Sequence, residues 1–134
     1  DEKEKNLRKV LNLGHTFAHA YEASLSYTNK LNHGEAVILG IISSAKFSFE
    51  NNILNKKDYN KIIKHINYLK FPSQLKYYFK KKHISKIIKY MKSDKKNNSS
   101  KINLILIKKI GKIILGSRFS ESIIKKFLVK ELIN

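Results

Sequence analysis

The segment from Gly34 to about Glu50 constrains the fold of this chain more than any other. Its early part, Ala36-Val37-Ile38-Leu39-Gly40-Ile41-Ile42, is apolar on every side of the helix that its residues favour. A helix without a polar face is buried by neighbouring elements. We therefore expect other helices or strands to pack around it.

A helix is also predicted from Glu2 to about Leu25, because apolar residues recur there at steps of three and four. The recurring residues are Leu7, Val10, Leu11, Phe17 and Ala18. Only Gly14 interrupts this pattern, and a glycine inside a helix costs about 1 kcal/mol relative to alanine. Such a glycine indicates a close approach of the backbone to a neighbour or a ligand.

Three further helices and a β-hairpin are predicted in the rest of the chain. Asp58 is a candidate cap for a helix that runs to about Leu69, and a helix is expected from Ile84 to Met91. Two apolar strands, Ile102 to Ile107 and Lys112 to Leu115, are divided by Gly111 and can pair as a hairpin. The last helix is expected from about Glu121 to Ile133, with Ser120 as its cap. The sequence thus predicts one mostly α-helical domain, residues 1–134, with a small β-hairpin.

Composition narrows the class of protein. The chain has no cysteine, so disulfides and thiolate metal sites are excluded. No stretch approaches the roughly 18 apolar residues that cross a membrane, and no signal-peptide pattern opens the chain. A cytoplasmic enzyme fits these observations, and a start at Asp1 without methionine suggests an excerpt of a longer protein.

The net charge of +18 raises the question of nucleic-acid binding. However, only Arg8 and Arg118 are arginines, and the lysines are spread through the whole chain. Lysine lacks the planar fork that recognises bases and phosphates in a bidentate way. We therefore interpret the charge as a solvated, lysine-rich surface, with a nucleic-acid-binding module as the alternative from another class.

Three histidines gather in two neighbouring segments. His15 and His19 stand four residues apart and so share a helix face, while His33 precedes the buried helix. Neutral imidazoles are ligands that zinc prefers, with Glu22 or Glu35 as a carboxylate ligand or partner. Spacing alone leaves open which two or three histidines bind metal. No carboxylate lies between the paired histidines, so the zinc-protease motif is absent.

Polar residues extend the first of these segments upstream. Glu4, Arg8 and Asn12 continue the row of His15 and His19 at helical spacing. A stripe with an acid, a cation, an amide and two imidazoles is too polar for a core face and suits a ligand with hydroxyl, carboxylate or phosphate groups. His65 and His83 lie in lysine-rich segments, where surface roles are expected.

These motifs resemble the C-terminal half of the 3-dehydroquinate synthase family. The resemblance rests on Glu4-x3-Arg8-x3-Asn12-Leu13-Gly14-His15-Thr16-x2-His19-x2-Glu22, on His33-Gly34-Glu35-Ala36-Val37, and on Met91-x2-Asp94-Lys95-Lys96. It covers nearly the whole chain. The family often has glycine where Ala18 stands, and the spacer before His33 is one residue longer here.

The resemblance implies a lyase of the shikimate pathway, and hence of chorismate and aromatic amino acid biosynthesis. The family converts 3-deoxy-D-arabino-heptulosonate 7-phosphate to 3-dehydroquinate and phosphate. It uses NAD and zinc or cobalt, is cytoplasmic, and is expected to form a homodimer. Its N-terminal α/β domain binds NAD and contributes a glutamate as the third metal ligand. Neither lies in these residues, so no cofactor-binding residue is assigned here and the chain alone is expected to be inactive.

Residue roles follow from the same resemblance. The metal ligands would be His15 and His33, and the acid/base candidates would be Glu4 and His19. The groups that bind substrate would be Arg8, Asn12, His19 and Lys95, with Lys96 as the alternative to Lys95 at the phosphate. Two alternatives remain within the same fold group, namely another sugar-phosphate cyclase or a metal-dependent glycerol or alcohol dehydrogenase.

Overall fold

The computed structural model describes residues 12–25, 30–68, 70, 74–92 and 101–133. Within these ranges the α-helices are α2 (His15–Ser24), α3 (His33–Glu50), α4 (Lys56–Tyr68), α5 (Ile84–Met91) and α6 (Glu121–Leu132). Two 3₁₀ turns, η1 (Leu75–Tyr77) and η2 (Lys81–His83), precede α5. The strands β1 (Lys101–Lys109) and β2 (Lys112–Ser120) pair as an antiparallel hairpin. The expected mostly helical domain with one small hairpin is confirmed.

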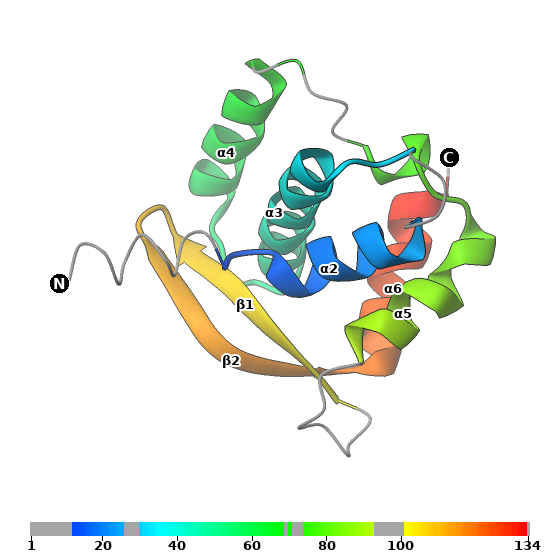
Figure 1. Cartoon of the computed structure of the whole chain (residues 1–134). Coiled ribbons are helices and arrows are strands. Elements are labelled where there is room, and N and C mark those ends of the chain that lie inside the picture. Colours follow the sequence, from blue (N-terminus) through cyan, green and yellow to red (C-terminus); the bar gives the residue numbers. More distant parts are fainter. Residues whose placement is uncertain (1–11, 26–29, 69, 71–73, 93–100, 134) are drawn as a thin grey trace, which may run out of the picture.

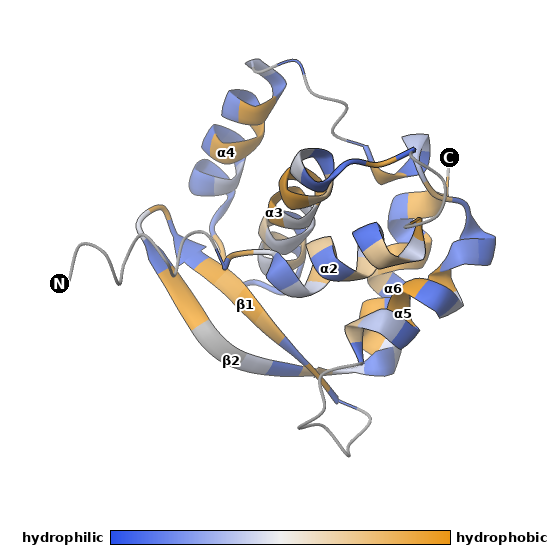
Figure 2. Cartoon of the chain, viewed as in Figure 1, coloured by the Kyte–Doolittle hydropathy of each residue, from blue (hydrophilic) through white to orange (hydrophobic). Residues whose placement is uncertain are grey.

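The helices pack around α2 and α3, which lie against each other at the centre of the molecule (Figure 1). The helices α5 and α6 lie on one side of this pair, and the hairpin runs along another. Helix α4 stands further out and contacts α3. Hydrophobic residues mark much of β1 and one side of several helices (Figure 2). No helix in the described ranges is long and apolar enough to cross a membrane.

Aromatic rings join these elements into one core. Phe17 of α2 is fully buried, and its ring lies 6.2 Å from that of Phe47 and 5.7 Å from that of Phe127. Phe119 at the end of β2 meets Phe47 edge to face at 4.8 Å. Tilted and edge-on contacts of this kind are the favoured geometry of aromatic pairs. The core therefore ties α2, α3, α6 and the hairpin together.

The central helix α3 is buried, but not on every side. Ala36, Leu39 and Ile42 are buried, whereas Ile38 and Ile41 are only half-buried and face a groove beside α4. The expectation of complete burial was therefore wrong for this side of the helix. Its start is fixed by a capping box, in which Asn32 accepts a hydrogen bond from the Glu35 backbone and Glu35 accepts one from the Asn32 backbone.

Two predicted helix boundaries need correction. The chain makes a turn at residues 12–14, Gly14 has φ of 79°, and α2 begins only at His15, so the helix does not continue through Gly14. A left-handed residue ends the regular hydrogen-bond ladder. In α4 the cap is Asn55, whose side-chain oxygen accepts a hydrogen bond from the Asp58 backbone at 2.8 Å, so Asp58 lies in the first turn instead.

Two other predicted features agree with the structure. Helix α5 has the predicted limits, and the Ser120 hydroxyl caps α6 by accepting a hydrogen bond from the Ile123 backbone at 3.4 Å. Gly111, with φ of 90°, lies in the turn of the hairpin. The second strand is longer than predicted and continues to Ser120. The later part of this strand alternates polar and apolar residues less regularly, so the hydrophobic pattern did not predict it.

Candidate functional site

One exposed face of α2 carries most of the candidate ligands. His15, His19 and Glu22 are spaced by four and three residues, so they form a row along the helix. The rings of His15 and His19 lie parallel, with an interplanar angle of 7° and centres 6.4 Å apart. An imidazole binds metal through a lone pair in its ring plane, so two stacked rings do not point at one ion. This pair is therefore poorly arranged to bind a single metal together.

The row ends at a contact with the second histidine segment. The His33 ring nitrogen Nδ1 lies 3.0 Å from the Glu22 carboxylate oxygen Oε1. Both side chains are accessible, with 79% of His33 and 41% of Glu22 exposed. A carboxylate on one ring nitrogen fixes the imidazole and leaves the other nitrogen to bind a metal. His33 thus has the partner expected of a metal ligand.

The packing beneath this face holds α2 and α3 in register. Tyr21 is fully buried and shares a hydrogen bond of 2.6 Å with Ser43 of α3. Burial raises the pKa of Tyr21, so its hydroxyl stays neutral. On the other side, the Thr16 hydroxyl donates to the backbone oxygen of Asn103 in β1. These bonds fix the helix that carries His15, His19 and Glu22.

Glu35, the other carboxylate considered for this site, has a different role. Besides the capping box, it accepts a hydrogen bond of 2.8 Å from the Tyr78 hydroxyl. The Asn32 backbone bond and then the Tyr78 bond lower the pKa of Glu35. Burial, followed by the bond to Glu35, raises the pKa of Tyr78 to about 12. The structure thus pairs His33 with Glu22 and places Glu35 at the start of α3.

The proposed stripe of ligand-binding side chains is only partly described. Asn12 is exposed and lies in the turn before α2, so it does not continue the helix face of His15 and His19. A single uninterrupted helical stripe from Asn12 onward was therefore a wrong expectation. Glu4, Arg8, Lys95 and Lys96 lie outside the described residues.

The other two histidines differ from each other. His65 is exposed, as expected for a surface residue. His83 is partly buried, and its Nδ1 accepts a hydrogen bond of 2.9 Å from the Lys80 backbone. Burial, and then the charge of Lys82, lower the pKa of His83. This capping role of His83 was missed because the 3₁₀ turn that it closes has no strong sequence signal.

Among the described residues, no group of three or more histidine or carboxylate side chains lies close enough to hold a metal ion. The donors that are present still suit zinc or cobalt, since they are imidazoles beside a carboxylate in a chain without thiols. They would make up only part of the ligand set of such an ion.

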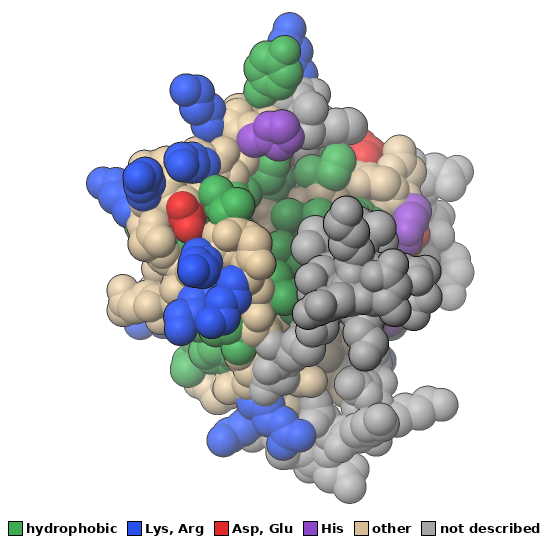
Figure 3. Space-filling view, turned by 90° about the vertical axis from the view of Figure 1, so that its left-hand side faces the viewer, with side chains coloured by type: hydrophobic (Ala, Val, Ile, Leu, Met, Phe, Trp, Pro, Cys, Tyr) green, Lys and Arg blue, Asp and Glu red, His purple; other side chains and the backbone are tan. Residues whose placement is uncertain are grey.

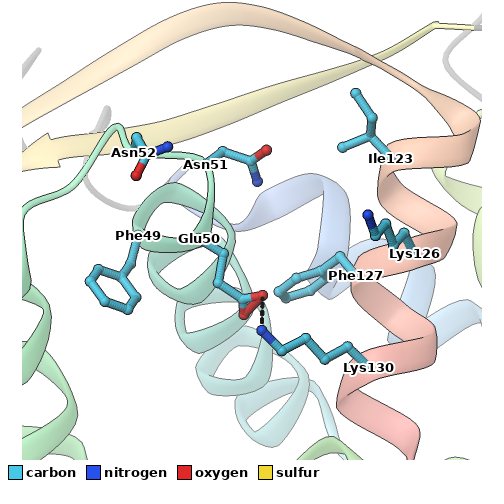
Figure 4. Close-up of a pocket in the computed structure, with 8 residues that line it drawn as sticks. All are labelled: Phe49, Glu50, Asn51, Asn52, Ile123, Lys126, Phe127 and Lys130. Atoms are coloured by element: carbon cyan, nitrogen blue, oxygen red, sulfur yellow. Dashed lines mark hydrogen bonds and ion pairs between the residues drawn. The ribbon is translucent and has the colours of Figure 1, made fainter.

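A hollow lies at the end of α3 that is opposite to His33. The rise of an α-helix places it about 25 Å from His33. Its walls come from the end of α3 and from α6, and Glu50 and Lys130 form an ion pair of 3.2 Å there (Figure 4). Lys126 and Asn51 also line it. This hollow is separate from the histidine face.

Comparisons with known proteins agree on one family. The profile of the family described as 3-dehydroquinate synthase C-terminal matches residues 1–97. The 3-dehydroquinate synthase of Pelagibacter ubique is 52% identical over 98% of this chain, and the alignment covers 36% of that protein. The enzyme of Zymomonas mobilis is 37% identical over 96% of the chain and 34% of its own length.

A solved structure shares the fold. A crystal structure of 2-deoxy-scyllo-inosose synthase complexed with carbaglucose-6-phosphate, NAD+ and Co2+ superposes with a TM-score of 0.67, at 22% identity. The match covers 89% of this chain and 34% of that one.

The described helices and hairpin therefore have the fold of a domain of that solved structure. The chain belongs to the 3-dehydroquinate synthase family, in the region of its C-terminal domain. It spans about a third of the length of the curated relatives that it matches.

Proposed function

We propose that the protein containing this chain is a 3-dehydroquinate synthase, which converts 3-deoxy-D-arabino-heptulosonate 7-phosphate to 3-dehydroquinate and phosphate. The observation that carries the proposal is the contact between Glu22 and His33 beside His15 and His19, in a chain of this family. The identity of 52% with one such synthase favours this reaction over that of another cyclase or a dehydrogenase.

In this proposal His15 and His33 hold a zinc or cobalt ion, with a third ligand from outside the described residues. The contact with Glu22 supports His33 as a ligand, because it fixes the orientation of the imidazole ring. The parallel stacking of His15 and His19 supports the assignment of only one of them to the metal. The bound ion would act as a Lewis acid on the substrate oxygens.

The remaining groups of this chain would bind substrate and handle protons. His19 is exposed one turn along from His15, so it can lie beside a substrate held near the metal and take the role of an acid or base. Arg8, Asn12 and Lys95 would bind the hydroxyl, carboxylate and phosphate groups, and Glu4 is a second acid/base candidate. Lysine and arginine offset the charge of a phosphate. NAD would bind to a part of the protein outside this chain.

The test is formation of 3-dehydroquinate and phosphate by the whole protein, supplied with the heptulosonate phosphate, NAD and zinc. The proposal expects both products in equal amounts and a loss of turnover when either NAD or the metal is removed. Residues 1–134 alone should release no phosphate above background. Turnover of glucose 6-phosphate in place of the heptulosonate would contradict the proposal and favour a different cyclase.

A nucleic-acid-binding function predicts a different result. Binding of the whole protein to DNA would weaken steeply as salt rises and would not depend on the histidines. The same His15→Ala variant that should lose turnover would then bind DNA as the parent does. A protein without synthase turnover that binds DNA in this manner would overturn the enzyme proposal.

A further inference from the structure

The hollow between the end of α3 and α6 has the size of a site for a small molecule. Its volume is about 490 Å³, within the range of roughly 300–1,000 Å³ that such sites span. Phe127 and Ile123 give it an apolar wall, and Asn51 and Lys126 face each other across it (Figure 4). We call it the α3–α6 hollow.

Two ion pairs hold the walls of the α3–α6 hollow together. Lys46 of α3 and Glu131 of α6 lie 2.8 Å apart, and only 14% of the Glu131 side chain is exposed. One turn further along α3, Glu50 pairs with Lys130 at 3.2 Å. The fold itself therefore shapes the hollow before a ligand binds, as is usual for small-molecule sites.

The α6 wall of the hollow carries a cation without a partner. Many lysines in the described ranges simply project into solvent, as on the face seen in Figure 3. Lys126 differs because it lines the hollow, where it forms no ion pair or hydrogen bond with another described residue. The nearby Lys130 is already neutralised by Glu50. One positive charge is thus left over, which favours a ligand with one negative charge over a phosphate dianion.

The α3 wall offers hydrogen-bond acceptors instead. Asn51 Nδ2 donates a hydrogen bond of 2.9 Å to the Phe47 backbone oxygen, and Asn51 Oδ1 has no donor among the described residues. The carbonyl groups at the C-terminal end of a helix also carry partial negative charge. This wall therefore suits a hydroxyl group, which donates a hydrogen bond, better than it suits an anion.

We propose that the α3–α6 hollow binds a small cyclic carboxylate that carries a hydroxyl group at its opposite end. The carboxylate pairs with Lys126 on one wall, and the hydroxyl donates to Asn51 Oδ1 on the other. The ring lies on Phe127 and Ile123. Because the hollow is separate from the histidine face, the inference does not rest on the proposed catalytic activity.

Ile123 supplies a reporter inside the hollow, because its side chain lines it and is 42% exposed. The whole protein is prepared with ¹³C-labelled isoleucine methyl groups and titrated with 4-hydroxybenzoate as the probe. The Ile123 methyl signal should shift in a saturable way. The methyl signal of Ile133, which is exposed at the other end of α6, should not shift. The signal of the fully buried Ile124 reports whether the fold is intact.

Related probes test the two ends of the ligand separately. Benzoate lacks the hydroxyl group, and 2-hydroxybenzoate uses its hydroxyl in a bond to its own carboxylate. Each should bind about fivefold more weakly than 4-hydroxybenzoate, as expected for the loss of one neutral hydrogen bond. The uncharged 4-hydroxybenzyl alcohol should bind more weakly by about tenfold or more, because it loses the bond to a charged group.

Substitutions on α6 test the role of Lys126. Lys126→Met removes the charge and should weaken binding of 4-hydroxybenzoate about tenfold, whereas Lys126→Arg keeps the charge and should retain binding. Lys125→Met is the matched control, because Lys125 is the next residue, is exposed and does not line the hollow. It should leave the affinity unchanged.

Three results would overturn the proposal. Absence of a saturable shift at Ile123 would mean that the hollow does not bind the probe. Equal losses of affinity in Lys125→Met and Lys126→Met would show only a general attraction between anions and a basic surface. Inorganic phosphate that binds in the hollow as tightly as 4-hydroxybenzoate would contradict the assignment to a hydroxylated carboxylate.

Discussion

Gly14 and Gly40 pack backbone to backbone where α2 begins. A Cβ atom on Gly14 would lie 2.4 Å from the carbonyl carbon of Gly40, and one on Gly40 would lie 2.5 Å from the backbone oxygen of Gly14. A Cβ on Gly40 would also meet Ala18. This contact fixes the start of the helix with His15 against the helix that begins at His33. The glycine pair thus positions the two segments of the candidate site.

Substitution of either glycine should destabilise the domain. Gly14→Ala combines a left-handed conformation, which costs about 1–2 kcal/mol, with a backbone clash of about 1–3 kcal/mol. Gly40→Ala suffers the clash alone. Gly111→Ala is the matched control, because its φ is 90° but a Cβ there meets nothing within 4 Å. Urea unfolding should rank the losses as Gly14 above Gly40 and Gly111. Equal losses at Gly14 and Gly111 would contradict the close packing.

The fate of Gly14 also shows what the sequence could predict. Its presence in a helical pattern indicated a close backbone approach, and the contact with Gly40 confirms this. The pattern could not reveal that the approach needs a left-handed residue, and so it predicted a continuous helix. Periodicity reports which face of an element is buried, whereas a positive φ depends on the tertiary contact that imposes it.

The candidate site was likewise predicted in part. Helical spacing placed His15 and His19 on one face correctly, because four residues make about one turn. The choice between Glu22 and Glu35 as partner of His33 stayed open, since it depends on how α2 and α3 cross. The cap at Asn32 was not predicted, although the sequence Asn32-x-x-Glu35 carries a recognisable capping pattern.

The Glu22 carboxylate is predicted to position His33 for metal binding. Glu22→Gln keeps the shape of the side chain but removes its charge, so zinc affinity of the whole protein should fall about 10- to 100-fold. The melting temperature should change little, because both side chains are exposed. Glu35→Gln serves as the control and should leave zinc affinity unchanged. A larger loss of zinc affinity in Glu35→Gln than in Glu22→Gln would show that Glu35, and not Glu22, supports the metal ligand.

Asn12 is predicted to act on substrate and not on stability. Its side chain is exposed in the turn before α2, so Asn12→Ala should raise the KM for the heptulosonate phosphate without removing metal. Arg8→Ala is expected to behave in the same way. Leu39→Ala is the comparison for a structural defect, since Leu39 is buried and its truncation should cost about 2–5 kcal/mol. A loss of unfolding free energy of that size in Asn12→Ala would show that Asn12 has a structural role.

The bond between Tyr78 and Glu35 predicts a change in the pH dependence of stability. Because the pKa of Glu35 is lowered from its ordinary value of 4.5, this carboxylate stabilises the fold above pH 4.5. That stabilisation is lost as the pH falls further. The raised pKa of Tyr78 gives a contribution that is lost as the pH rises from 10 to about 12.

Tyr78→Phe should therefore cost about 1 kcal/mol near neutral pH. It should also make stability fall less steeply below pH 4.5 and remove the Tyr78 loss above pH 10. Urea midpoints measured across this range are the readout. Tyr77→Phe is the control, because Tyr77 is 70% exposed. Parallel pH curves for Tyr78→Phe and the parent protein would count against the bond.

The metal content of three histidine variants tests the account most directly. Zinc bound per molecule of whole protein is measured for His15→Ala, His33→Ala and His19→Ala, with His65→Ala as a control at an exposed position. The account predicts that His15→Ala and His33→Ala lose the metal, whereas His19→Ala keeps it and loses turnover. A site emptied by His19→Ala but still filled in His15→Ala or His33→Ala would contradict the assignment.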